Sequence, residues 1–202
     1  MTDRDSVPAI RPMAMNSALQ ARLQVGFESH DTSGREVLYR YLRDSDDLQA
    51  LTELLHQAYA PLAAAGMRFV ASFQDEEVTR SRVQAGETIV AVEGGRIVGT
   101  ITLKAPGTAH GTAFLERADV ASVGQFAVAP SHQGRGIGPM LARLVEQRAG
   151  ELLARYIALD TSERATRLIA AYERQGFRHV EYVQWSGLNY RSVVMAKPLA
   201  TG

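Results

Sequence analysis

Residues 128–139 read VAPSHQGRGIGP, and the chain changes character on either side of this stretch. An apolar run ends in it, three glycines fall within it, and a long amphipathic pattern follows it. Because glycine lacks a Cβ atom, the backbone here can approach a ligand closely, and the N–H groups at a helix start attract anions. The stretch therefore predicts a cradle for a phosphate or pyrophosphate, with Arg135 as a charged contact. A tight turn before a helix, with no ligand, is the simpler alternative.

Apolar spacing on both sides of residues 128–139 predicts an α/β domain. Alternating apolar residues indicate strands, and apolar residues three and four apart indicate helices. The predicted elements are, in order, a strand (36–42), a helix that ends before Pro61, a helix (75–84), a hairpin (88–93 and 96–103) that turns at Gly94-Gly95, a strand (122–129), a helix (137–152), a strand (156–161), a helix capped by Thr161 or Ser162, and two strands (178–185 and 190–197). The short links between residues 122 and 182 favour a parallel strand pair at the centre of a mixed sheet.

The composition is typical of one folded domain. With 202 residues, 46% of them hydrophobic and 22% charged, the chain is long enough to bury a sizeable core. The absence of cysteine excludes a disulfide scaffold, a thiolate metal cluster and a covalent thiol mechanism. Because 22 basic residues balance 22 acidic ones, we expect no nucleic-acid or membrane partner. No window resembles a membrane span or a secretory leader, so we expect a cytoplasmic protein.

Two segments are expected to lie outside the sheet. Residues 1–35 predict an N-terminal arm with one short helix near 17–25. The arm is either a loosely packed extension or a segment that covers substrate or contacts a second copy. Residues 105–120 contain proline, glycine and few β-branched side chains, which predicts a long loop, and long loops inside a domain are often functional.

Other phosphate motifs and metal motifs are incomplete in this chain. The three glycines of the stretch are two residues apart, which does not fit the dinucleotide fingerprint, and no Gly-Lys-Ser/Thr follows for a P-loop. A nucleotide-binding module is therefore a disfavoured alternative. The five histidines show neither the paired spacing nor the neighbouring ligands of a zinc site, so we predict no metal.

Two motifs make the chain resemble the GNAT N-acetyltransferase family. Gln133-x-x-Gly136-x-Gly138 is similar to the family's Gln/Arg-x-x-Gly-x-Gly/Ala signature, with Pro130 at the usual distance. Residues 171–177, AYERQGF, resemble the family's tyrosine-containing helix end and Gly-Phe turn. The similarity in element order runs through residues 36–199. For this segment the resemblance implies the family's α/β domain, a mixed central sheet with helices on both faces and a parallel strand pair at its centre.

The resemblance also implies an activity and a cofactor. A member of the family moves the acetyl group of acetyl-CoA to a primary amine of a small molecule or peptide, by direct attack in a ternary complex. The candidate cofactor-binding residues are Phe126, Ala127, Val128, Gln133, Gly134, Arg135, Gly136, Ile137, Gly138 and Pro139. The strand residues would pair with the pantetheine arm and polarise the thioester carbonyl through their N–H groups, and the loop residues would hold the pyrophosphate.

Tyr172 is the candidate general acid, because it matches the family's tyrosine that protonates the departing thiolate of CoA. A phenol, with a reference pKa of about 10, can donate to a thiolate whose own value is about 8.5. The alternative is that Tyr172 only completes an apolar helix face with Leu168 and Ile169.

Several residues are candidates for the general base. Asp160, at the end of its strand, takes the place of a glutamate base in some members that this chain resembles, such as ribosomal-protein N-terminal acetyltransferases. An aspartate beside a helix N-terminus is also common without any catalytic role. Glu116, Asp119 and His110 in the preceding loop remain alternatives, acting directly or through water.

Two positions depart from the family pattern. Ala165 stands where the family often has an asparagine seven residues before the tyrosine. Pro139 removes an N–H group that usually faces phosphate. Because each change removes a cofactor contact, a non-catalytic acyl-CoA-binding or regulatory domain of the same fold is the second hypothesis.

No motif identifies the acceptor or the assembly. We expect Trp185, Tyr182 and Tyr190 to pack in a strand core, and lining of an acceptor pocket is the alternative. Folds of this family often pair through their late strands, so the resemblance suggests a homodimer.

Overall fold

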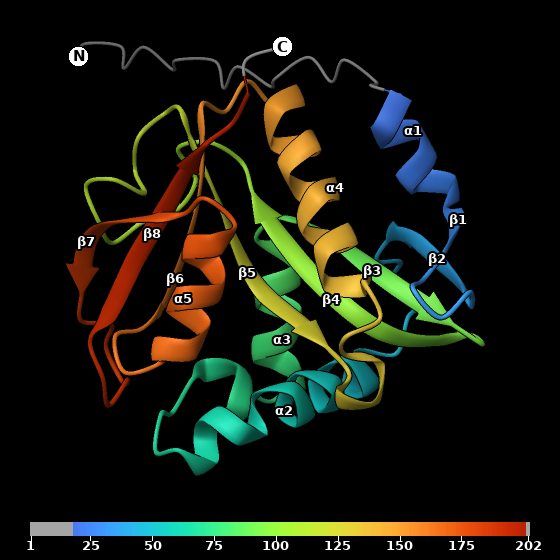
Figure 1. Ribbon diagram of the computed structural model, residues 1–202, viewed down its shortest axis with the longest axis horizontal. Coiled ribbons are helices and arrows are strands. Elements are labelled where there is room, and N and C mark those ends of the chain that lie inside the picture. The colour runs from blue at the N-terminus through green and yellow to red at the C-terminus, as the bar shows by residue number, and fades with distance from the viewer. Residues whose placement is uncertain (1–17, 201–202) are drawn as a thin grey trace, which may run out of the picture.

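A computed structural model describes residues 18–200, which fold around an eight-stranded sheet of order β1-β2-β3-β4-β5-β6-β8-β7 (Figure 1). The strands are β1 (Phe27–His30), β2 (Glu36–Tyr41), β3 (Glu87–Glu93), β4 (Arg96–Lys104), β5 (Val120–Val128), β6 (Tyr156–Ser162), β7 (Arg178–Val183) and β8 (Ser192–Pro198). The helices are α1 (Ala18–Val25), α2 (Leu48–Ala64), α3 (Glu76–Gln84), α4 (Ile137–Glu151) and α5 (Thr166–Arg174), with short 3-10 turns η1 (Val70–Ser72) and η2 (Pro130–His132).

The sheet is mixed, as the sequence predicts. β5 and β6 run parallel, and each of the other neighbouring strand pairs in the described part of the chain is antiparallel. Parallel neighbours need a crossover, and α4 provides it between β5 and β6. The prediction of a parallel pair at the centre of the sheet is therefore confirmed.

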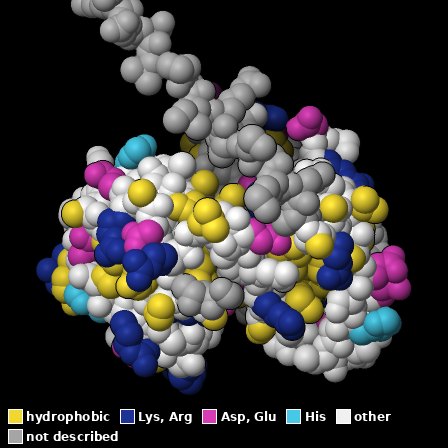
Figure 2. Space-filling view, turned by 90° about the horizontal axis from the view of Figure 1, so that it is seen from above, with side chains coloured by type: hydrophobic (Ala, Val, Ile, Leu, Met, Phe, Trp, Pro, Cys, Tyr) yellow, Lys and Arg dark blue, Asp and Glu magenta, His cyan; other side chains and the backbone are white. Residues whose placement is uncertain are grey.

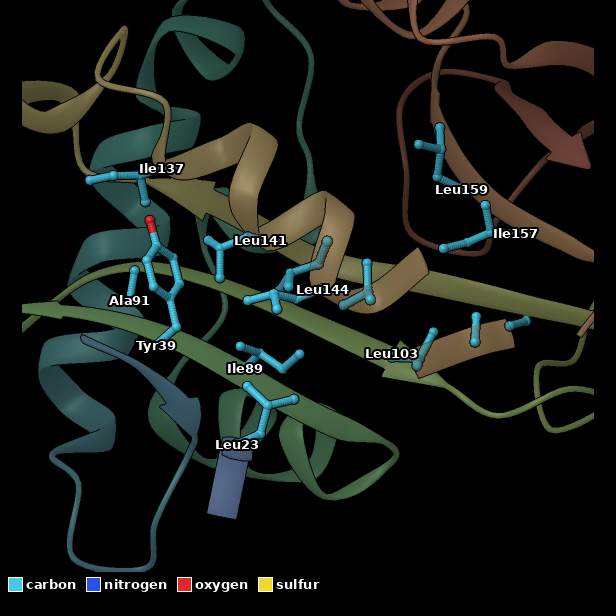
Figure 3. Close-up of a cluster of buried hydrophobic side chains, with 14 of the residues drawn as sticks. Leu23, Tyr39, Ile89, Ala91, Leu103, Ile137, Leu141, Leu144, Ile157 and Leu159 are labelled. Atoms are coloured by element: carbon cyan, nitrogen blue, oxygen red, sulfur yellow. The ribbon is translucent and has the colours of Figure 1, made fainter. Parts of the chain in front are cut away.

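Helices cover both faces of the sheet. In Figure 1, α1, α4 and α5 lie in front of the sheet and α3 lies behind it. The main core forms between the sheet and α4, where Leu141 and Leu144 point toward Ile89 of β3 (Figure 3). On the opposite face, Leu55 of α2 belongs to a second buried cluster with Ala127 of β5. Both faces of the central strands are thus apolar, which explains their continuous apolar runs.

The predicted hairpin and long loop are confirmed. β3 and β4 are joined by Gly94 and Gly95, whose φ values of 55° and 77° suit a type I′ turn. Residues 105–119 contain no strand or helix and connect β4 to β5. Gly176 follows α5 with a φ of 91°, the left-handed conformation of a helix-ending glycine.

The prediction of two helix boundaries is wrong. α2 continues through Pro61 to its end one turn later, where the loss of one backbone hydrogen bond is tolerated because Leu62 packs on a neighbouring apolar cluster. α5 begins after Ala165, which makes no side-chain cap. Ser162 does not cap this helix because it is still paired with β8, and its hydroxyl accepts a hydrogen bond from Arg164 N at 3.2 Å.

α1 and β1 fall within the expected N-terminal arm. Leu19 and Leu23 of α1 are buried in the main core, and β1 pairs with β2 through Phe27 and Tyr39. The sequence pattern does not predict β1, because a strand of four residues is too short to establish an alternating pattern. The rest of the expected arm, residues 1–17, lies outside the described residues.

The surface shows no large region of one charge on the face seen in Figure 2, where basic and acidic side chains are interspersed. This distribution agrees with the formal net charge of zero. Between residues 18 and 200, no helix combines the length and apolar character needed to cross a membrane.

Candidate active site

The sheet opens between its two parallel strands. β5 and β6 pair only at Val120–Tyr156, Ala121–Ile157 and Ser122–Ala158. Beyond these pairs the strands diverge, as Figure 1 shows, and a cavity of about 350 Å³ lies between them. We call it the central cavity; residues from β5, β6, α2, α3 and α5 line it.

A β-bulge in β5 shapes the wall of the central cavity. Two residues of β5, Gln125 and Phe126, lie opposite the single residue Ile101 of β4, and Gln125 has a φ of 48°. A side-chain-bearing residue in this left-handed region costs roughly 1–2 kcal/mol, so packing must hold the bulge in place. The hydroxyl of Tyr59 on α2 contributes by donating a hydrogen bond of 3.2 Å to the carbonyl of Phe126.

The glycine loop presents N–H groups without acceptors. Gly134 and Gly136 have φ values of 76° and 84°, and Gly136 is the N-cap residue of α4 with no side-chain cap. Within the described part of the chain, no hydrogen bond is recorded from N–H of Gly134, Gly136 or Gly138. Together with the positive end of the α4 dipole, these donors form a surface suited to an anion.

Arg135 does not extend freely from this loop. Its guanidinium binds Asp31 and lies 2.6 Å from Oε1 of Glu93, while its carbonyl accepts a hydrogen bond of 3.0 Å from Thr32 N. Nε2 of His132 lies 2.6 Å from the same Glu93 carboxylate. The hydrogen bond from Arg135 is the main cause that lowers the pKa of Glu93. In this arrangement Arg135 fixes the loop against β3 and the β1–β2 turn.

A second cavity of about 270 Å³ links the glycine loop to the central cavity. Val128, Gln133, Ala171 and Gln175 line this loop-side cavity, and Gln133 Nε2 donates a hydrogen bond of 3.1 Å to the carbonyl of Val128. Tyr172 lines both cavities. The two spaces therefore meet at the phenol ring of Tyr172.

Tyr172 is half-buried on α5. Its ring packs on the main core and makes an edge contact with Phe177 at 5.8 Å between ring centroids. Burial is the main cause that raises the pKa of Tyr172, and the neighbouring Tyr59 and Asp160 raise it further. Tyr172 therefore packs on the apolar core, as the helix pattern predicts, and also lies beside the cavities.

Asp160 lies on β6 and lines the central cavity. Its Oδ2 accepts a hydrogen bond of 2.9 Å from Nε1 of Trp185. Two of the other candidate bases are engaged elsewhere: Glu116 accepts a hydrogen bond of 3.0 Å from Gly111 N, and Asp119 pairs with Arg117 at 2.8 Å.

A third space of about 300 Å³, the outer cavity, adjoins the central cavity on the side of the long loop. His110 lines it, and Asp160 and Trp185 line both it and the central cavity. Trp185 and Tyr190 pack in apolar clusters, as expected, and both also line the central cavity, which was the alternative. Tyr182 lies outside these spaces, 51% exposed on β7 with Arg191 stacked on its ring.

Three cavity residues have no counterpart in the sequence predictions. Tyr59 and Arg82 come from α2 and α3, and Lys104 ends β4. No motif or spacing in the sequence marks them, because only the folding of α2 and α3 against the sheet brings them to the opening. In the described part of the chain, no group of three or more histidine, aspartate or glutamate residues is arranged to hold a metal ion.

Comparisons with known proteins agree on one family. The Acetyltransferase (GNAT) family model matches residues 48–177. The S-(2-succino)cysteine N-acetyltransferase of Bacillus subtilis (strain 168) is 31% identical to this chain over 133 residues, which cover 65% of this chain and 78% of that protein.

Solved structures show the same fold at lower sequence identity. The GNAT domain of S. lividans PAT superposes with a TM-score of 0.63 at 20% identity, covering 86% of this chain and 97% of that one. A GNAT family acetyltransferase from Elizabethkingia anophelis, with acetyl-CoA bound, has a TM-score of 0.56 at 17% identity, covering 81% of this chain and 98% of that one.

Proposed function

Because the chain belongs to the GNAT acetyltransferase family and is an acetyltransferase enzyme, we propose that it transfers the acetyl group of acetyl-CoA directly to a primary amine in a ternary complex. The observation that carries the proposal is a pair of adjoining cavities, one lined by Gln133 of the glycine loop and the other by Asp160, with Tyr172 among the residues that line both. The acceptor is the amine of a small molecule or peptide. The similarity to the S-(2-succino)cysteine N-acetyltransferase of Bacillus subtilis favours a small molecule.

The cofactor is proposed to follow the loop-side cavity. The unpaired N–H groups of Gly134, Gly136 and Gly138, with those of Arg135 and Ile137, would bind the pyrophosphate, and Gln133 and Pro139 would flank it. The pantetheine arm would lie along Phe126, Ala127 and Val128, where β5 has no partner from β6. The chain's own contribution here is the edge of β5 that β6 leaves unpaired, on which the carbonyls of Phe126 and Val128 accept hydrogen bonds from the side chains of Tyr59 and Gln133.

The reaction needs a proton acceptor for the amine. An alkylammonium group with a pKa of about 10.4 is almost entirely protonated at neutral pH, so a carboxylate beside it lowers the cost of attack. Asp160 is proposed to take this proton, with its orientation held by Trp185. His110 in the outer cavity remains the second candidate.

Bond making and breaking are proposed to occur between Asp160 and Tyr172. The amine nitrogen attacks the thioester carbonyl, whose oxygen becomes negative and is stabilised by N–H groups of β5 near the bulge. The carbon–sulfur bond then breaks, and Tyr172 donates its proton to the thiolate of CoA. The nitrogen loses its second proton as the amide forms, and this proton restores the phenol of Tyr172. Burial raises the pKa of Tyr172, which keeps the phenol protonated as the thiolate forms and also makes it a weaker acid.

Three further features of the protein are proposed: its catalytic unit, its assembly and its location. Residues 36–199 form the catalytic unit, and the N-terminal arm packs on it through α1 and β1. A homodimer would form through the late strands, where edge strand β7 exposes Val180 and Tyr182. A cytoplasmic location completes the proposal.

The proposal is tested by cofactor binding followed by transfer. Acetyl-CoA at about 100 times its Kd stabilises a folded protein by about 2.7 kcal/mol, so we expect a clear rise in Tm with acetyl-CoA and a smaller one with longer acyl-CoAs. CoA release is then measured with S-(2-succino)cysteine, free amino acids and short peptides as acceptors. A rise in Tm without CoA release from any amine would contradict transfer, and no rise with any thioester would contradict the cofactor site.

A further inference from the structure

The central and outer cavities carry an excess of positive charge. The charged residues that line them are Arg82 and Lys104, which are cationic, and Asp160, which is anionic; His110 adds a titratable ring. Two cations stand against one carboxylate, although the chain as a whole has a net charge of zero. The region that receives the acceptor is therefore locally positive.

Arg82 differs from the other poorly exposed arginines of the chain. Arg40 pairs with Asp46 at 2.7 Å, and Arg148 pairs with Glu87 at 2.8 Å. Among the described residues, Arg82 has no carboxylate within ion-pair distance; its Nη1 donates to the side-chain amide oxygen of Gln74 at 2.8 Å. A neutral amide orients the guanidinium without neutralising it.

Gln74 is itself fixed, so the orientation of Arg82 is not accidental. Gln74 is 2% exposed, and its Nε2 donates a hydrogen bond of 2.6 Å to Thr79. The other terminal nitrogen of Arg82, Nη2, lies 3.8 Å from where a Cβ of Gly124 would be. The absence of a side chain on Gly124 leaves that nitrogen open toward the diverging part of β5.

Two more donors face the same space. Lys104 has no hydrogen bond or ion pair recorded within residues 18–200, and it lines both cavities. Gln125 is 3% exposed and also lines both, and its Nε2 has no hydrogen-bond partner. A buried donor normally has an acceptor, so Nε2 of Gln125 is available to an oxygen atom of a ligand.

We infer that the acceptor is an amine that also carries at least one carboxylate, which Arg82 and Lys104 bind while the amine faces Asp160. A zwitterion of this kind matches the separation of charges in the cavity. Its ammonium group would face Asp160, and its carboxylate would face Arg82 and Lys104. Arg82 and Lys104 are then specificity-determining residues. This inference rests on the proposed acetyl transfer, but carboxylate recognition can be measured separately from it.

The test uses a matched series of cysteine thioethers. S-carboxymethylcysteine and S-carbamoylmethylcysteine have nearly the same shape but differ by one side-chain charge, and S-(2-succino)cysteine adds a further carboxylate. For the wild-type enzyme we expect kcat/KM to be about tenfold or more higher for S-carboxymethylcysteine than for its neutral amide, in line with one charge-assisted hydrogen bond. Because both cysteine thioethers keep an α-carboxylate, S-methylcysteamine, an amine without any carboxylate, completes the series. A kcat/KM for S-methylcysteamine equal to that for S-carboxymethylcysteine, or a preference for O-phosphoserine over the carboxylates, would overturn the inference.

Substitutions identify the residues responsible. Arg82→Met and Lys104→Met each remove a charge but keep a long apolar stem, and each should reduce the charged-to-neutral preference about tenfold, mainly through KM. Arg82→Lys should restore part of it. The control is Arg80→Met, on the same helix, where Arg80 is exposed and pairs with Glu76 at 2.5 Å. An unchanged charged-to-neutral preference in both Arg82→Met and Lys104→Met would overturn the assignment of these residues to carboxylate binding. If Arg82→Met does not fold, Lys104→Met still tests the assignment.

Calorimetric binding in the presence of CoA separates the two proposals. S-carboxymethylcysteine should bind the wild-type protein and bind Arg82→Met about tenfold more weakly, whether or not acetyl transfer occurs. Binding that depends on Arg82 without any transfer would preserve carboxylate recognition and overturn the proposed activity. Acetyl transfer to amines at rates that do not depend on the charge of the amine substrate would support the proposed activity and overturn carboxylate recognition.

Discussion

Nε1–H of Trp185 donates a hydrogen bond of 2.9 Å to Oδ2 of Asp160, joining the segment after β7 to the central strand β6. The indole ring also lies against the long loop, because a Cβ on Gly111 would fall 2.4 Å from it. The orientation of the Asp160 carboxylate therefore depends on two segments that are distant in sequence. This relationship ties the candidate base to the loop that borders the outer cavity.

Replacement of Trp185 by phenylalanine should impair use of the acceptor and spare cofactor binding. The change keeps an aromatic ring but removes the N–H group that holds Asp160, and a hydrogen bond to a charged group contributes about 1.5–3 kcal/mol. We expect kcat/KM for the acceptor to fall at least about tenfold, with the rise in Tm caused by acetyl-CoA unchanged. An unchanged kcat/KM, or a parallel loss of acetyl-CoA binding, would count against this role.

Tyr172→Phe should lower kcat by about 100-fold or more, the usual contribution of a general acid, while acetyl-CoA still raises Tm. Because burial raises the pKa of Tyr172 above its reference value of about 10, this group should cause no alkaline loss of kcat below about pH 10. The matched control is Tyr182→Phe, since Tyr182 lies outside the cavities. A kcat for Tyr172→Phe equal to that of the control would exclude the acid role.

Local patterns predicted the sheet well because most strands and helices here are long enough to show a period. The parallel pair follows from the short links around α4, and the Gly94-Gly95 turn sets the hairpin. The sequence pattern does not predict β1, because this strand has only four residues. The end of α2 was misplaced because tertiary packing of Leu62 outweighs the local effect of Pro61.

The residues of the candidate site also differ in how far the sequence predicts them. Tyr172 and Asp160 stand near recognisable motifs, and the fold brings both to the central cavity. Arg82 and Lys104 stand near none, since an arginine in a polar helix and a lysine at a strand end are ordinary residues. Their meaning appears only when α3 and β4 are placed beside the opening between β5 and β6, which is a property of topology rather than of local sequence.

Gly136→Ala should weaken acetyl-CoA binding and Gly138→Ala should not. At Gly136 the φ of 84° strains any side chain, and a Cβ would lie 3.1 Å from Thr32, so we expect a loss of about 1–2 kcal/mol in stability and a lower affinity. At Gly138 the Cβ would make an ordinary contact of 3.6 Å with Val128. Calorimetric titration of acetyl-CoA measures both.

Gly150→Ala is the control for these glycine changes. A Cβ on Gly150 meets nothing within 4 Å, and the residue lies in the same helix, α4. It should gain about 0.5–1 kcal/mol of stability with no change in acetyl-CoA affinity. Equal affinities of Gly136→Ala and Gly150→Ala would show that the loop conformation does not govern binding.

The protein should lose stability above about pH 10 in part through Tyr59. Burial raises the pKa of Tyr59 to about 12, whereas the unfolded chain loses this proton near pH 10. The stabilisation is therefore complete below about pH 10 and is lost as the pH rises toward 12. Urea denaturation at about pH 8 and about pH 11 should show a smaller loss for Tyr59→Phe than for wild type. The same loss in both would refute this contribution.

Leu153→Gly should stabilise the protein. Leu153 follows the end of α4 with a φ of 62° and is 85% exposed, so it bears the strain of the left-handed conformation without burying its side chain. Hydrogen bonds of 2.9 Å from Leu153 N to Gly150 O and 3.0 Å from Ala154 N to Ala149 O form the helix-ending motif in which glycine is preferred.

Relief of the strain at residue 153 contributes roughly 1–2 kcal/mol, and the greater freedom of glycine in the unfolded chain offsets about half of it. A net gain of about 0.5–1 kcal/mol should raise Tm by roughly 1–4 °C for a chain of this size. Leu153→Ala separates the causes, since alanine removes the exposed apolar side chain but keeps the strained φ. An equal gain in Leu153→Ala and Leu153→Gly would mean that backbone strain at this position contributes nothing to the free energy of unfolding.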